Sequence, residues 1–180
     1  MHESSSRRHD IDVARAADAL VEMLDAACGM MRVPFDRARM RRLLESRLEA
    51  LGDNSSDGAL PGSEALLDSA ATCGLRMDLL TLDAEGAVAA FRPGAPVARW
   101  ERDVDGSMRW LVIVDVRGSK VGYRMSEAGE VVHWASVSEF SAMCQRPAVA
   151  TAWIGMEPLL ACGSDASPHA DGHSHSTPLR

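Results

Sequence analysis

The chain has 180 residues, 46% of them hydrophobic and 25% charged, and its formal net charge at pH 7 is −7. A chain of this length can bury its own core as one globular domain, and the acidic balance argues against a nucleic-acid partner. No apolar stretch reaches the roughly 18 residues that a membrane-spanning helix needs, so the sequence predicts no such helix.

The N-terminal segment MHESSSRRHD and the cysteines indicate a cellular setting. No apolar stretch follows the arginines of this segment, so a signal peptide is not expected. The cysteines lack the paired spacing of a zinc site, and we predict no metal and no other cofactor. Without an export signal, reduced thiols and a cytoplasmic location are expected. The cysteines are Cys28, Cys73, Cys144 and Cys162.

The first part of the chain is predicted to be helical. Residues 1–10 are polar and are expected to form a disordered leader. Apolar residues then recur at helical spacing over residues 11–31. A second helix is predicted over residues 37–51, with Asp36 as its N-cap, and a third over residues 64–73.

The second part of the chain is predicted to form a sheet. Residues 109–125 contain a β-branched run, the turn RGSK and a return run, a pattern typical of a β-hairpin. The first arm is apolar on both faces, which indicates a central strand. Helices followed by about five antiparallel strands indicate the α+β class. The other strands are expected at residues 75–82, 97–101 and 130–134, with short helices at 83–91 and 136–144.

We expect the folded domain to cover residues 11–146 and a C-terminal extension to cover residues 147–180. The extension ends in a Ser- and Gly-rich tail that holds His169, His173 and His175. Such a histidine run can bind a divalent metal with low selectivity. A disordered polar linker is the preferred interpretation of this tail.

Several phrases between Val13 and Cys144 carry a likeness to a known family. They are AADA at 16–19, Pro34 fifteen residues later, the helix at 37–44, LLDSAATCGL at 66–75, PVA at 96–98, RWLVI at 109–113, SKV at 119–121 and SVSEF at 136–140. In this order they resemble the papain-like cysteine peptidase domain at the N-terminus of bacteriocin-processing ABC exporters. The resemblance implies a papain-like α+β fold, with N-terminal helices packed on a C-terminal antiparallel sheet.

The positions that carry catalysis in this family are changed in the chain. By the resemblance, Ala19 stands where the family has its nucleophilic Cys, Arg109 where it has its His, and Met125 near its Asp. A cysteine peptidase needs a thiolate, a base and a group that orients the base, and Arg keeps its proton at any usable pH. The resemblance therefore implies a pseudo-peptidase with no catalytic residue retained, and hence a protein that is not an enzyme.

The family also implies a place beside a transporter. The domain would lie on the cytoplasmic side of the inner membrane and hold an export substrate or its leader peptide. Its neighbours would be the membrane and nucleotide-binding domains of an ABC exporter, and ATP hydrolysis would belong to the latter. The cleft between the first helix and the sheet is the expected groove for an extended peptide. Its expected lining is Ala19, Trp100, Arg109, Trp110 and Trp134.

Two other interpretations stay open. Cys28 is followed by Gly29, which is the family's own nucleophile dipeptide. A displaced Cys28–His133 pair would make the chain an active leader-cleaving peptidase, although a core thiol and a packing or surface histidine are the plainer interpretations of these two residues. The third interpretation is a stand-alone interaction scaffold without a groove function.

Overall fold

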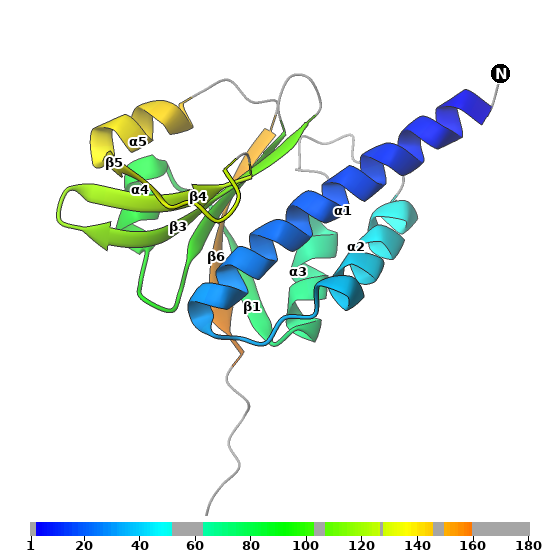
Figure 1. The fold of residues 1–180 in the computed structure, drawn as a ribbon, viewed down its shortest axis with the longest axis horizontal. Coiled ribbons are helices and arrows are strands. Elements are labelled where there is room, and N and C mark those ends of the chain that lie inside the picture. Colours follow the sequence, from blue (N-terminus) through cyan, green and yellow to red (C-terminus); the bar gives the residue numbers. More distant parts are fainter. Residues whose placement is uncertain (1–2, 52–62, 103–106, 127, 146–149, 160–180) are drawn as a thin grey trace, which may run out of the picture.

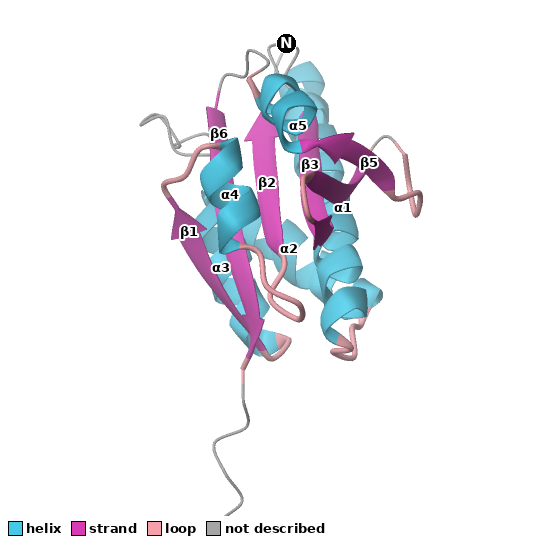
Figure 2. Cartoon of the chain, turned by 90° about the vertical axis from the view of Figure 1, so that its left-hand side faces the viewer, coloured by secondary structure: helices cyan, strands magenta, loops and turns pink. Residues whose placement is uncertain are grey.

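The computed structural model describes residues 3–51, 63–102, 107–126, 128–145 and 150–159. In this part of the chain, three helices pack on one face of a six-stranded sheet and two shorter helices lie on the other face (Figure 1, Figure 2). No helix among them is long and apolar enough to cross a membrane. The helices are α1 (Glu3–Met31), α2 (Arg37–Leu51), α3 (Ser63–Thr72), α4 (Ala84–Ala90) and α5 (Val137–Cys144).

Every neighbouring pair of strands in the sheet is antiparallel. The spatial order β1-β6-β2-β3-β4-β5 places the last strand of the sequence between the first and the second. Helices followed by this antiparallel sheet confirm the predicted α+β class. The strands are β1 (Leu75–Leu80), β2 (Val97–Arg102), β3 (Met108–Arg117), β4 (Lys120–Met125), β5 (His133–Ser136) and β6 (Ala150–Pro158).

The sheet separates two hydrophobic cores, because successive side chains of a strand point to opposite faces. On β3, Trp110 and Val112 join the core under α1, α2 and α3. Leu111 and Ile113 join the core under α4 and α5. We call these sides of the sheet the three-helix face and the two-helix face. The first core also holds Leu20, Leu24, Met40, Leu44, Leu66 and Trp100, and the second holds Val97, Val121, Tyr123, Phe140 and Trp153.

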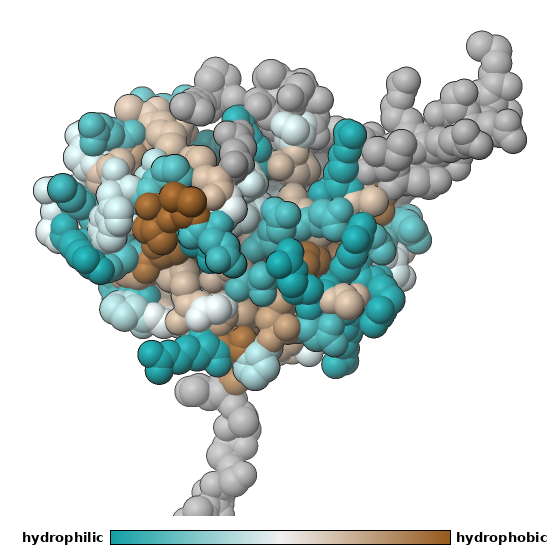
Figure 3. Space-filling view, in the orientation of Figure 1, coloured by the Kyte–Doolittle hydropathy of each residue, from teal (hydrophilic) through white to brown (hydrophobic). Residues whose placement is uncertain are grey.

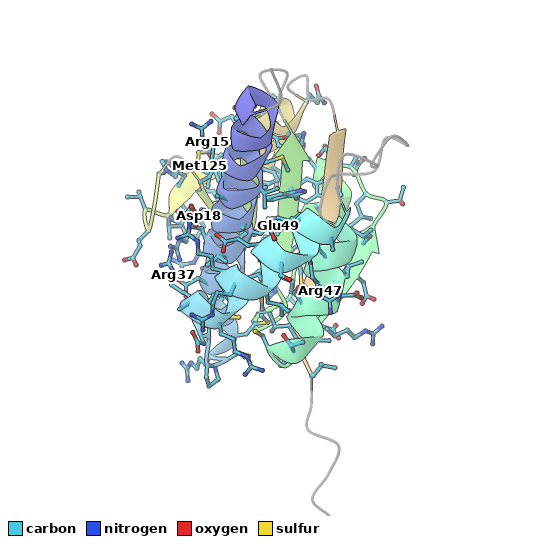
Figure 4. The ribbon with its side chains drawn as sticks, turned by 90° about the vertical axis from the view of Figure 1, so that its right-hand side faces the viewer. Arg15, Asp18, Arg37, Arg47, Glu49 and Met125 are labelled. Carbon is cyan, nitrogen blue, oxygen red and sulfur yellow. The ribbon has the colours of Figure 1, made fainter. Side chains whose placement is uncertain are left out.

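Exposed ion pairs cover the outer surface of the three-helix face. Arg37 on α2 lies 3.1 Å from Asp25 on α1, and Arg41 lies 3.2 Å from Asp18. Figure 4 shows Asp18 and Arg37 on these two helices, and Figure 3 shows that the surface over α1 and α2 is largely hydrophilic. Exposed pairs of this kind contribute about 1 kcal/mol or less each. The helices are therefore held mainly by their buried apolar sides.

The structure differs from the predicted domain limits at both ends. α1 begins at Glu3, inside the segment predicted to be a disordered leader. β6 lies inside the predicted extension 147–180, yet it pairs with both β1 and β2 and belongs to the sheet. β5 begins at His133 instead of residue 130. In the predicted hairpin, β3 is a central strand, whereas β4 is next to the edge strand β5.

Candidate functional site

A row of side chains crosses the two-helix face of the sheet. The strand register aligns Leu80 of β1 with Trp153 of β6, and Trp153 with Arg99 of β2. Arg99 is aligned in turn with Leu111 of β3. Trp153 and Leu111 belong to the core under α4 and α5, so the buried charge of Arg99 lies on the same side. An arginine among apolar neighbours on a central strand marks this row as a candidate site.

Arg99 is 7% exposed and is held by three contacts. Its Nε donates to Oε2 of Glu101 at 2.8 Å, and its Nη1 donates to the carbonyl oxygen of Cys144 on α5. Its guanidinium also lies over the Trp153 ring, 5.7 Å from the ring centre. A second guanidinium joins the cluster, because Nε of Arg109 lies 3.4 Å from Oε1 of Glu101. Two cations therefore share one carboxylate in a largely buried position.

A pocket of about 640 Å³ opens beside Arg99. Its floor is formed by β6 and β2, and its walls are the β1–α4 connection and the C-terminal half of α5. We call it the α4/α5 pocket; Figure 2 shows these two helices on the same face of the sheet. Ser141 lines it, and the Ser141 Oγ atom is buried without a hydrogen-bond partner among the described residues. The other lining residues are Leu79, Leu80, Thr81, Leu82, Asp83, Ala84, Glu85, Arg99, Cys144, Gln145, Thr151, Ala152 and Trp153.

A second, much smaller pocket of about 50 Å³ lies on the other side of the arginine cluster. Arg99 and Cys144 line both pockets. Burial raises the pKa of the Cys144 thiol, while its charge interaction and hydrogen bond with Arg99 act in the opposite direction. Cys144 is thus a mostly buried thiol beside a fixed cation, between two cavities.

The structure brings two of the three predicted triad positions together. Arg109 and Met125 both line the small pocket on the two-helix face. Ala19 instead packs against the core under α1, α2 and α3. The sheet therefore lies between Ala19 and the other two residues, and the expected trio does not share one cleft.

The predicted peptide groove is divided in the same way. Trp100 is fully buried in the three-helix core, and Trp110 is 4% exposed. Trp134 is 42% exposed and stacks with Arg117, whose guanidinium lies 4.9 Å from the ring centre. Arg109 and Trp110 line the small pocket, but neither Trp100 nor Trp134 does. The expectation of one groove lined by all five residues is therefore corrected.

The structure also separates Cys28 from His133. Cys28 is fully buried in the three-helix core, and burial raises the pKa of its thiol to about 12. His133 stacks on Tyr123 with ring centres 5.7 Å apart, and Tyr123 belongs to the core of the other face. A dyad of these two side chains would have to act through the sheet. The structure favours the packing role for both residues.

The predicted site residues did not include Arg99, Ser141 or Trp153. A signal was present, because Arg99 and Glu101 lie two residues apart and the other residues of the stretch 97–101 are apolar. Such a pattern indicates paired charges on one face of a sheet. Among the described residues, no group of three or more His, Cys, Asp or Glu is arranged to hold a metal ion. The histidines at 169, 173 and 175 lie outside the described residues.

No protein-family model and no curated protein matches this chain. Among solved structures, it is similar to the crystal structure of the Pseudomonas avirulence protein AvrPphB. The TM-score is 0.46 and the identity 10%, and the match covers 78% of this chain and 92% of that chain. AvrPphB is a cysteine protease of papain-like fold. No residue role is taken from this likeness.

One prediction is corrected. We predicted that the chain is not an enzyme, because Ala19, Arg109 and Met125 occupy the family's catalytic positions. That prediction is wrong as a conclusion about the chain, since the loss of one triad does not make a protein a non-enzyme and the described residues include three free cysteines. The changed positions show only that these three side chains form no triad. They say nothing about other residues.

Proposed function

We propose that this domain binds an extended polypeptide segment on its two-helix face, as the substrate-recognition domain of an ABC exporter. The observation that carries the proposal is the α4/α5 pocket of about 640 Å³. Binding sites for organic ligands usually enclose about 300–1,000 Å³ and combine apolar walls with a few placed polar groups. This pocket has both, in Leu80 and Trp153 on one hand and Arg99 and Ser141 on the other.

The position of the pocket beside an edge strand favours a peptide as the occupant. Among the described strands, β1 pairs only with β6, so its other side presents backbone N–H and C=O groups. An extended chain can pair with such an edge as an additional strand. Leu79 and Leu82, which are 50% and 36% exposed, line the pocket where β1 ends. A bound polypeptide segment that pairs with the outer edge of β1 would therefore reach the pocket and cover these leucines.

The exporter context of the proposal is supported by the sequence. The phrases from AADA at 16–19 to SVSEF at 136–140 resemble the peptidase domain of bacteriocin-processing exporters. In this proposal the domain lies on the cytoplasmic side of the membrane, and the bound segment belongs to an export substrate or its leader. The partners are the membrane and nucleotide-binding domains of the exporter.

A peptide library tests the binding function directly. Random dodecapeptides displayed with a free carboxyl terminus are selected on the immobilised protein, and the enriched peptides are synthesised and measured by calorimetry. Thr151 is exposed, lines the pocket and is aligned with Glu101, so Thr151→Trp fills the pocket without removing a core contact. We expect it to weaken binding at least tenfold. Val131 is 59% exposed and does not line the pocket, so Val131→Trp is the matched control. Failure to enrich any peptide, or equal loss in both variants, would contradict the proposal.

Crosslinking in cells tests the exporter context. A photoreactive benzoylphenylalanine replaces Leu82, which lines the pocket and is 36% exposed. We expect the crosslinked polypeptide to be one that also accumulates in the culture medium. Crosslinks confined to polypeptides that never leave the cell would contradict the exporter role and leave peptide binding standing.

A further inference from the structure

We infer that the α4/α5 pocket takes up a basic side chain, lysine or arginine, of the bound polypeptide. The inference rests on the proposed function and specifies the kind of residue that enters the pocket. It follows from the charges that line the pocket, from the helix end that forms one wall and from the apolar surface between them.

Among the described residues, Arg99 alone brings a positive charge to the pocket lining, and this charge already has its partners. Arg99 is 7% exposed, and its Nε donates to Oε2 of Glu101 at 2.8 Å. Its Nη1 donates to the carbonyl oxygen of Cys144. Because a carboxylate lies directly against this guanidinium, the pair adds little positive potential to the rest of the cavity.

Two acidic residues line the pocket at the start of α4. Asp83 and Glu85 are both exposed, and neither forms an ion pair with a basic side chain of the described residues. Asp83 accepts a hydrogen bond from the Gly86 backbone N–H at 2.7 Å and caps the seven-residue helix α4, but its charge has no cationic partner. Since the charge of Arg99 is paired with Glu101, the uncompensated charge of the lining is negative.

The C-terminal end of α5 favours the same charge in the occupant. Ser141 and Cys144 of this helix and its C-cap residue Gln145 line the pocket. The last carbonyl groups of a helix carry a partial negative charge, so a cation is stabilised near them. The hydrogen bond from Arg99 to the Cys144 carbonyl oxygen shows that a guanidinium fits against this helix end. A basic side chain of a bound peptide would meet acceptors of the same kind.

The apolar surface of the pocket suits the stem of a basic side chain. Leu80, Leu82 and Trp153 line the same cavity as the two carboxylates. Lysine and arginine carry three or four methylene groups before the charged group, and these can cover apolar surface while the charge stays in contact with water. Asp83 and Glu85 are exposed, so the charged group would lie at the rim of the pocket. A glutamate would bring another negative charge to the same place.

The test compares three peptides that differ at one position. The probes are acetylated and amidated peptides Gly-Ser-Val-Thr-Xaa-Thr-Val-Ser-Gly, in which Xaa is lysine, norleucine or glutamate, and calorimetry gives the dissociation constants. Norleucine keeps the stem of lysine and lacks its charge. We expect lysine to bind about fivefold more tightly than norleucine, and glutamate to bind more weakly than both, because an exposed ion pair is worth at most about this factor. The lysine preference should shrink in about 0.5 M NaCl, since salt screens exposed charges.

Variants locate the effect at the two carboxylates. Glu85→Gln and Asp83→Asn remove one charge each, and asparagine keeps the N-cap of α4 because it caps helices as well as aspartate does. We expect each variant to reduce the lysine preference about twofold, and the double variant to abolish it. Glu130 is exposed and does not line the pocket, so Glu130→Gln is the matched control and should leave the preference unchanged.

The outcomes separate this inference from the proposed function. Binding of the norleucine or glutamate peptide as tightly as the lysine peptide would overturn the inference and leave peptide binding intact. A lysine preference that persists in the double variant would place the cation elsewhere and would also overturn it. Binding of none of the three peptides would count against the proposed function itself.

Discussion

Glu101 is a carboxylate shared by two largely buried guanidinium groups, those of Arg99 and Arg109, so its removal should destabilise the fold. Its side chain is 16% exposed, against 8% for Arg99 and 23% for Arg109. Glu101→Gln keeps the size of the side chain but removes the negative charge that Arg99 and Arg109 share. Breaking a buried ion pair from one side usually costs about 3–5 kcal/mol. Because this cluster retains some solvent access, we expect the lower end, about 3 kcal/mol.

The loss should appear in both chemical and thermal unfolding. Urea titration followed by circular dichroism should show a lower midpoint with an unchanged slope. For a domain of this size, each kcal/mol corresponds to roughly 2–4 °C in the thermal midpoint, so the midpoint should fall by about 6–12 °C. Glu130 is an exposed glutamate, and Glu130→Gln is the matched control with an expected change below about 0.5 kcal/mol.

A second substitution tests whether the loss comes from the charges. Adding Arg109→Met to Glu101→Gln removes one of the two cations and so relieves their repulsion. The double variant should therefore be more stable than the sum of the two single losses, by about 1–2 kcal/mol. A loss below about 1 kcal/mol for Glu101→Gln, or strict additivity in the double variant, would refute the reasoning that the cluster is held by this carboxylate.

Three further predictions concern other parts of the fold. Burial raises the pKa of the Cys28 thiol from 9.0 to about 12, so this thiol loses its proton at lower pH in the unfolded chain than in the folded one. The free energy of unfolding should therefore fall between about pH 9 and 12, by up to 1.4 kcal/mol per pH unit. In urea titrations, Cys28→Ala should show a smaller fall with pH than the unchanged protein, and an identical pH dependence would contradict this. Ser136 accepts a hydrogen bond from the Glu139 backbone N–H at 3.2 Å in a capping box. Ser136→Ala should therefore lower the free energy of unfolding by about 1 kcal/mol in urea titrations, and a change below about 0.3 kcal/mol would count against the cap. Gly118 has φ +58° in the β3–β4 turn, so Gly118→Ala should cost about 1–2 kcal/mol, measured by thermal unfolding; an unchanged midpoint would mean that the turn relaxes.

Local patterns predicted most of the elements, because each depends on neighbouring residues. The 3.6-residue period marked α1 and α2, and the β-branched runs around the RGSK turn marked β3 and β4. β6 was missed because its partners, β1 and β2, are far away in the sequence. A strand that pairs with two strands distant in the sequence is not marked by a hairpin turn, and β6 ends at Pro158.

The site could be predicted only in part, for a related reason. Candidate residues were chosen because their positions match phrases of the family. Such a match gives the order of the residues along the chain, but it does not say to which face of the sheet each side chain points. Arg109 and Met125 do come together. Ala19 does not join them, because a strand turns alternate side chains to opposite faces and Arg109 is aligned with Glu101 on the two-helix face. The contribution of α5 could not be predicted either, since Ser141 and Cys144 meet β2 and β6 only through the fold.

The register of β2 and β3 decides on which face any chemistry of this chain takes place. Arg99 and Glu101 occupy alternate positions of β2, and Arg109 is aligned with Glu101 on β3, so a slip of one residue in either strand would move its charges into the apolar core under α1. The cost of burying those charges there would far exceed that of burying apolar side chains. The charged cluster therefore fixes the register, and one of its members, Arg99, is a buried cation that lines the α4/α5 pocket. Arg99 thus contributes both to the stability of the cluster and to the proposed binding pocket. A substitution that weakens peptide binding through Arg99 should also alter the free energy of unfolding, whereas Glu85→Gln should affect binding alone.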